Sequence, residues 1–233
     1  VMEQGQTDLF EFLIRSPSGY FPDEIAIDFL IQIFSAIDYL HSINLVHCDI
    51  KPENFVLKMD KGKVELKLVD FGNIRRKPKP KERLFNFCGT RDYMAPETLE
   101  KFGFDEKVDE WAAGIIMFNI LTGVDPFSSE DDSEYKDNIR FKEIKFEYIK
   151  NEKLRNLNKK LLNRYVANRI CSKEALIEIK RIKMERDNYK QGIKRITKKT
   201  PSIVLQKEIK ENEEYLDYWG TISSRIRGGY GLF

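Results

Sequence analysis

A short segment, residues 46–54, constrains the fold of this chain more than any other part of the sequence. It reads Val-His-Cys-Asp-Ile-Lys-Pro-Glu-Asn and follows a long apolar segment with helical periodicity. Asp49, Lys51 and Asn54 place a carboxylate, an ammonium and an amide in one short loop. This spacing is typical of a loop that holds a hydroxyl nucleophile, a transferring phosphoryl group and a metal ion together.

A second motif follows the first at short distance. Residues 68–72 read Leu-Val-Asp-Phe-Gly, which predicts a strand that ends in Asp70, Phe71 and Gly72. Either motif alone is weak evidence, because Asp-x-Lys can be a surface turn and Asp-Phe-Gly a chance tripeptide. Together and in this order, they resemble the catalytic loop and the metal-binding loop of eukaryotic protein kinases.

Three later segments extend this resemblance over residues 1–178. Residues 88–97 resemble the end of a kinase activation segment, and residues 109–114 resemble the central-helix motif that anchors the catalytic loop. Arg169, with Glu174, Ala175 and Leu176 a few residues later, resembles the Arg near the end of a kinase domain that pairs with the activation-segment Glu, here Glu97. The resemblance implies a mainly α fold, like the C-terminal lobe of a protein kinase, with a few short β-strands.

The resemblance also implies a role for each matching position. Asp49 would accept or orient the proton of the attacking hydroxyl, and Lys51 would contact the phosphoryl oxygens. Asn54 and Asp70 would bind Mg²⁺ and complete the catalytic set. The positions that match structural or substrate-platform residues are His47, Phe71, Gly72, Thr90, Glu97, Asp109 and Arg169. The positions that match the ATP-binding hinge and adenine pocket are Met2, Glu3, Gly5, Asp8 and Val56, although core packing is the alternative for Met2 and Val56.

The expected function is therefore that of a Ser/Thr protein kinase, which transfers the γ-phosphoryl group of ATP to protein hydroxyls and needs Mg²⁺. Lys51 and Thr90 together resemble the serine/threonine branch. The alternatives are a pseudokinase or scaffold, which usually has lost an Asp of these loops, and a small-molecule kinase of similar fold. The Gly-rich loop, the strand Lys and the helix Glu of a kinase would precede Val1. We therefore expect a fragment without the N-terminal β lobe, with little or no activity alone.

Composition excludes several other classes. The 40 Lys and Arg nearly balance the 38 Asp and Glu, so the chain has no nucleic-acid-like excess of positive charge. The 3 Cys and 2 His contain no Cys-x-x-Cys pair, which argues against a zinc site and favours a reducing, intracellular and cytoplasmic location. No transmembrane segment is expected from the apolar runs.

The activation loop departs from the usual kinase pattern. Cys48 stands where many kinases have an Arg that pairs with a phosphate on this loop. Residues 72–88 contain no Ser, Thr or Tyr, and Asn86 stands where a phosphorylated Thr often lies. We therefore expect that phosphorylation of this loop does not switch the activity. The basic residues 75–83 are interrupted by Pro, which predicts a solvated, mobile loop.

Residues 179–233 lie outside the resemblance and are treated as a C-terminal extension. Ile179, Ile182 and Tyr189 follow helical spacing among Lys and Arg, which predicts a basic amphipathic helix over residues 172–196. The layout resembles the calcium/calmodulin-dependent kinase group, which implies a calmodulin contact or an autoinhibitory contact of residues 179–196. The alternative is a solvated helix that packs one stripe on the lobe.

The remaining elements follow from periodicity and turn residues. A short helix after its Asp8 cap and a long helix from Pro22 are expected, the long one buried nearly all round. Strands are expected at residues 55–57 and 64–69, joined by a hairpin turn. Further helices are expected at residues 109–122, 139–149 and 154–165, with an acidic loop at 128–138.

Overall fold

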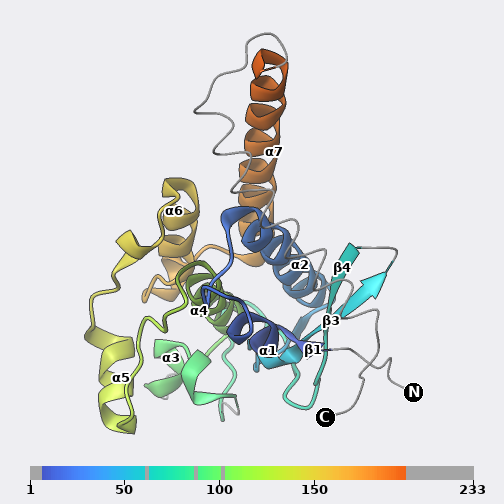
Figure 1. The fold of residues 1–233 in the computed structure, drawn as a ribbon. Coiled ribbons are helices and arrows are strands. Elements are labelled where there is room, and N and C mark those ends of the chain that lie inside the picture. Colours follow the sequence, from blue (N-terminus) through green and yellow to red (C-terminus); the bar gives the residue numbers. More distant parts are fainter. Residues whose placement is uncertain (1–6, 61–62, 87–88, 101–102, 198–233) are drawn as a thin grey trace, which may run out of the picture.

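The computed structural model describes residues 7–60, 63–86, 89–100 and 103–197 (Figure 1). The predicted fold class is confirmed, because the described chain is mainly helical with a few short strands. The predictions for Met2, Glu3 and Gly5 concern residues outside the described ranges. The helices are α1 Leu9–Ile14, α2 Asp23–Ser42, α3 Pro96–Leu99, α4 Lys107–Thr122, α5 Asp132–Phe141, α6 Glu152–Leu161 and α7 Ser172–Thr197. The strands are β1 Thr7–Asp8, β2 Leu45–Val46, β3 Phe55–Asp60, β4 Lys63–Leu68 and β5 Arg75–Arg76.

Helix α2 lies at the centre of the fold, between α4 and α7 (Figure 1). Phe29, Leu30, Ile33 and Phe34 are all buried, which confirms an apolar surface wider than one stripe. The prediction of burial on nearly all sides is wrong at Tyr39, whose side chain is 64% exposed. By length and composition α2 could span a membrane, but 50% of its apolar window is buried inside the fold, as in a core helix.

Helix α4 forms the second layer of the core, and its buried residues occupy every side of the helix. It ends at Gly123, which has a φ of 72° and supplies a left-handed C-cap. A Cβ atom at Gly114 would lie 2.9 Å from side-chain atoms of both Leu161 and Leu162. Helix α6 therefore packs directly on the backbone of α4.

Two small antiparallel sheets flank the helices. In the first, β3 pairs with β4 as the predicted hairpin, and β1 adds to β3 so that Asp8 lies opposite Val56. In the second, β2 pairs with β5, with Val46 opposite Arg75. The basic segment predicted to be a loop thus begins as a strand. Lys77 then forms a 2.8 Å ion pair with Glu106.

The prediction for residues 128–149 is wrong. The structure has α5 over part of the predicted acidic loop, and most of the predicted helix is irregular apart from a short 3₁₀ turn. Asp131 caps α5 by accepting a 2.7 Å hydrogen bond from the Glu134 amide, and Tyr135 and Ile139 bury one side. Acids in a first helical turn favour a helix, so an acidic composition alone was a poor sign of a loop. Helix α6 also ends before residue 165.

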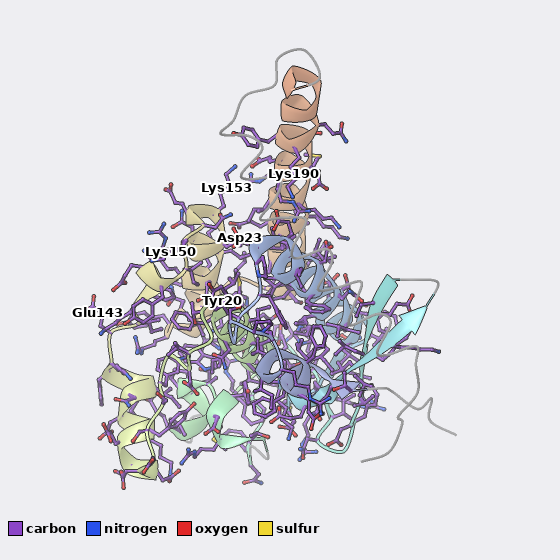
Figure 2. All side chains as sticks on the ribbon, in the orientation of Figure 1. Tyr20, Asp23, Glu143, Lys150, Lys153 and Lys190 are labelled. Carbon is purple, nitrogen blue, oxygen red and sulfur yellow. The ribbon has the colours of Figure 1, made fainter. Side chains whose placement is uncertain are left out.

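Helix α7 packs one stripe on α2 and then extends away from the body of the fold (Figure 1). Ile179 and Ile182 are buried in this stripe. Lys183 pairs with Asp28 of α2 at 2.6 Å, and Lys190, labelled in Figure 2, pairs with Glu24 at 2.6 Å. The predicted helix is confirmed, and two of its cations, Lys183 and Lys190, pair with acids of α2.

Candidate active site

Asp109 of α4 binds the backbone of the loop between β2 and β3, which is the predicted catalytic loop. The buried carboxylate of Asp109 accepts hydrogen bonds from the amides of His47, at 2.8 Å, and Cys48, at 2.9 Å. Cys48 has a φ of 64°, so the chain turns through a left-handed conformation immediately before Asp49. Because α4 is immobilised by its own burial, this loop has a rigid support.

Asp49 lies in a network with Lys51 and Thr90. Its Oδ1 accepts hydrogen bonds from the Thr90 hydroxyl at 2.8 Å and from the Thr90 amide at 3.0 Å. The Nζ of Lys51 lies 2.9 Å from the Thr90 hydroxyl and 3.4 Å from Asp49 Oδ2. Burial alone would raise the pKa of Asp49, but the hydrogen bonds from Thr90 and the charge of Lys51 outweigh burial and lower it. Asp49 is therefore ionised at neutral pH.

Asn54 connects this loop to the strand that leads to Asp70. The side-chain Nδ2 of Asn54 donates a 2.8 Å hydrogen bond to the backbone carbonyl of Asp49. The backbone carbonyl of Asn54 accepts a 2.9 Å hydrogen bond from the amide of Val69. Since the side-chain Nδ2 of Asn54 is bonded to the backbone of Asp49, the side-chain oxygen Oδ1 is the atom of Asn54 that can ligate a metal. Asp70 has a φ of 61° and an exposed carboxylate.

The donor set at this point fits Mg²⁺. An Asn oxygen and an Asp carboxylate are the oxygen ligands that this ion prefers, and Mg²⁺ usually takes its other ligands from water and phosphate. Gly72 leaves space beside the carboxylate, because a Cβ there would come 3.2 Å from Asp70 Oδ1. The Gly72 amide also lies 3.3 Å from the same oxygen and orients it.

The other predicted positions fall into two groups. His47 is buried and its ring contacts that of Phe71 edge-on, with 5.6 Å between centroids. Asp8 caps α1 by accepting a 2.8 Å bond from the Glu11 amide, and it shares the β1–β3 pairing with Val56. Met2, Glu3 and Gly5 lie outside the described residues, so their predicted place beside adenine stays a prediction.

Glu97, seven residues after Thr90, forms an ion pair with the buried Arg169. The guanidinium donates to both carboxylate oxygens, at 2.6 Å and 3.0 Å, and it lies 5.0 Å above the centre of the Trp111 ring. It also donates to the carbonyl of Lys107 at 2.8 Å. The predicted pairing is present, and it ties the segment after Thr90 to α4.

Sequence reasoning missed several residues around this site. Asn73 donates a 3.4 Å hydrogen bond to Asp49 Oδ2, and its position next to Gly72 was the signal that could have found it. His41 contacts both Asp109 and Glu110 behind the loop. Both His41 and Glu110 lie within long apolar helices, so no sequence pattern indicated that they contact the support of the catalytic loop.

A hollow of about 430 Å³ lies beside the segment that follows Thr90, and Asp49 is not among the residues that line it. The residues that line it are Arg91, Asp92, Asp125, Ser128, Ser129, Glu130 and Tyr135. Burial raises the pKa of Asp125. Arg91 lies 2.8 Å from Asp92 and 4.8 Å above the Tyr135 ring, so a cation of the chain itself offsets part of this acidic charge.

Comparison with known proteins supports the same assignment. A family model described as protein kinase domain matches residues 1–179. An Aurora kinase of Saccharomyces cerevisiae is 42% identical over 119 residues, which are 51% of this chain and 31% of that protein. The serine/threonine-protein kinase zyg-8 of Caenorhabditis elegans is 42% identical over 130 residues, 54% of this chain and 16% of that protein. The human serine/threonine-protein kinase Sgk2 is 41% identical over 108 residues, 46% of this chain and 29% of that protein. The chain spans less than a third of the length of each of these relatives, and closeness to the calcium/calmodulin-dependent group stays a prediction.

Proposed function

The chain belongs to the protein kinase domain family, and from that premise we propose that it carries the phosphoryl-transfer residues of a Ser/Thr protein kinase that phosphorylates protein hydroxyls. The observation that carries this proposal is the network of Asp49, Lys51 and Thr90, with Thr90 Oγ1 2.8 Å from Asp49 Oδ1 and 2.9 Å from Lys51 Nζ. It joins a carboxylate, an ammonium and a hydroxyl from two distant segments. The relatives named above are themselves called Ser/Thr or Aurora kinases.

In this proposal each side chain has a limited task. Asp49 is ionised, so it accepts a hydrogen bond from a substrate hydroxyl and orients that hydroxyl, taking its proton late in the transfer. Lys51 supplies positive charge beside the oxygens of the transferring group. Asn54 and Asp70 supply oxygen ligands, and bound ATP with Mg²⁺ supplies the activated phosphoryl group. His47, Phe71, Asp109, Glu97 and Arg169 hold the loops that position these groups.

For α7 we propose packing on the lobe rather than capture by calmodulin. Two apolar residues of the predicted stripe, Ile179 and Ile182, are buried against the lobe, whereas Tyr189 is exposed. Two of its cations are paired with acids of α2. Helix α7 also continues through residue 178, so the domain boundary placed there stays a prediction, as does an intracellular, cytoplasmic location.

The experiment compares Asp49→Asn with Asp137→Asn in the full native protein, because a complete ATP site also needs a Gly-rich loop and a strand Lys. Asp137 is an exposed acid on α5 and serves as the matched control. We expect Mg²⁺-dependent transfer from ATP to serine or threonine peptides. Asp49→Asn should lower kcat about 100- to 10,000-fold, while Asp137→Asn should match the wild type.

Two results would contradict the proposal. The first is a folded wild-type protein that binds ATP but transfers no phosphate, which would favour the scaffold alternative. The second is full activity of Asp49→Asn, which would remove Asp49 from the chemistry.

A further inference from the structure

A second charged cluster lies behind the catalytic loop, and the chemistry described above does not use all of it. His41, at the end of α2, is buried between two consecutive acids of α4. Its Nε2 lies 2.9 Å from Asp109 Oδ2, and its Nδ1 lies 3.2 Å from Glu110 Oε1. One imidazole therefore bridges two buried carboxylates.

This cluster reaches the start of α7. The amide of Ser172, the first residue of α7, donates a 2.8 Å hydrogen bond to Glu110 Oε1. The Ser172 hydroxyl lies 3.3 Å from His41 Nδ1. The first amides of a helix have no partner within the helix, and negative charge is favourable there. Glu110 thus caps α7 from another helix.

Packing alone does not explain a Glu at this position. The other oxygen of Glu110, Oε2, is buried and has no hydrogen-bond partner among the residues that the structure describes. An unpartnered buried oxygen is unfavourable, and an apolar side chain would suit the interior position of α4 better. The carboxylate therefore serves the contacts of its first oxygen, with His41 and Ser172.

The charge of His41 holds the cluster together. Burial alone would lower the pKa of His41, but the hydrogen bonds and charges of Asp109 and Glu110 outweigh burial and raise it to about 10. Glu106, just before α4, also faces this charge, and it is paired in turn with Lys77. At neutral pH the imidazolium therefore offsets part of the negative charge of the neighbouring acids.

We propose that Glu110 is a positioning residue. It couples the packing of α7 on the lobe to the position of the catalytic loop, residues 46–54. The path runs from the Ser172 amide through Glu110 and His41 to Asp109, which binds the amides of His47 and Cys48. The proposal rests on the phosphoryl-transfer function proposed above. Under this proposal, a partner or a change that alters how α7 packs on the lobe changes activity through Glu110. It does so without binding in the ATP cleft.

The first test is kinetic and uses the full native protein. Glu110→Gln keeps the size of the side chain and removes its charge, and Glu185→Gln makes the same change at an exposed position of α7. We expect Glu110→Gln to lower kcat per folded molecule about tenfold, with the KM for ATP within twofold of wild type. Glu185→Gln should leave both constants unchanged.

A pH profile separates positioning from simple loss of folded protein. Without the Glu110 charge, His41 loses its proton at lower pH, although Asp109 and Glu106 still face it. The ratio of wild-type kcat to Glu110→Gln kcat should therefore rise reversibly between pH 7 and pH 9, while circular dichroism stays constant. A ratio that is flat across this range would overturn the role of the cluster.

Two variants of Ser172 test the same path if Glu110→Gln folds poorly. Ser172→Pro removes the amide proton that binds Glu110, and Pro is well tolerated at the first position of a helix. Ser172→Ala keeps that proton and is expected to lose less activity. Equal kcat in Ser172→Pro and Ser172→Ala would overturn the proposal.

A double-mutant cycle tests transmission directly. Ile182→Ala loosens α7 on α2, and it should lower kcat in the wild type but have little further effect in Glu110→Gln. Independent effects of the two changes would show that no coupling passes through Glu110. A wild-type protein without any phosphoryl transfer would instead refute the underlying function, so the two failures are distinguishable.

Discussion

Asp49 and Thr90 are joined by two hydrogen bonds to one carboxylate oxygen, at 2.8 Å from the hydroxyl and 3.0 Å from the amide of Thr90. The two residues are 41 positions apart in the chain. The contact joins the loop between β2 and β3 to the segment that follows β5. The position of Asp49 Oδ1 is therefore fixed in part by Thr90.

The Thr90 hydroxyl can be removed without changing the size of the side chain. Thr90→Val deletes the hydrogen bond to Asp49 and the partner of Lys51, and a hydrogen bond to a charged group contributes about 1.5–3 kcal/mol. We expect kcat/KM to fall about 10- to 100-fold in Thr90→Val, whereas Thr90→Ser should stay near wild type. Equal activity of Thr90→Val and Thr90→Ser would show that the hydroxyl is not used.

Phosphatase treatment should leave the activity within about twofold. Residues 72–88 contain no hydroxyl side chain, and the β2–β5 pairing with the 2.8 Å Lys77–Glu106 ion pair supplies order without a phosphate. Because this pair is partly exposed, Lys77→Ala should cost less than about 1 kcal/mol, or about fivefold in kcat. A large loss of activity after phosphatase treatment would contradict this independence.

The elements of the core were predictable because local chemistry and tertiary packing agree there. Helices α2 and α4 carry long apolar patterns, and Gly123 ends α4 with the conformation that glycine favours. Helix α5 was missed, since its two buried residues, Tyr135 and Ile139, are few among acids. The site residues could be assigned by motif, whereas Glu110 and Ser172 could not, because no sequence pattern reports a contact between positions that distant.

The buried pair of Glu97 and Arg169 should dominate the stability of the segment after Thr90. Glu97→Gln leaves the guanidinium of Arg169 buried without its counter-charge, which costs about 3–5 kcal/mol. Glu65→Gln is the control, because its 3.3 Å pair with Lys67 is exposed and contributes less than about 1 kcal/mol. The measurement is the free energy of unfolding in urea, and a loss below about 1 kcal/mol in Glu97→Gln would contradict the expectation.

Two glycine substitutions should separate activity from stability. Gly72→Ala crowds Asp70 Oδ1 at 3.2 Å in an exposed turn, so kcat should fall about tenfold with little change in the free energy of unfolding. Gly114→Ala places a methyl 2.9 Å from Leu161 and Leu162, and overpacking of this kind costs about 1–3 kcal/mol. The expectation fails if both variants lose activity only in proportion to their folded fraction.

The stability of the fold should fall as pH rises from about 6.5 to about 10. The pKa of His41 is raised from 6.5 to about 10 by Asp109 and Glu110 in spite of burial, so the folded state holds a proton that the unfolded state releases in this range. The stabilisation is complete below pH 6.5 and lost above about pH 10. Urea unfolding at several pH values should show this slope in the wild type, and His41→Gln should flatten it.

The contact between α2 and α7 also has a consequence for biosynthesis. Helix α2 is made before α7, the helix that covers one side of it and is the last described element of the chain. At about 5–20 residues per second, the ribosome leaves this apolar surface uncovered for on the order of ten seconds. During that time the side of α2 that packs on α7 lacks its cover, and the completed core forms only after translation has passed α7.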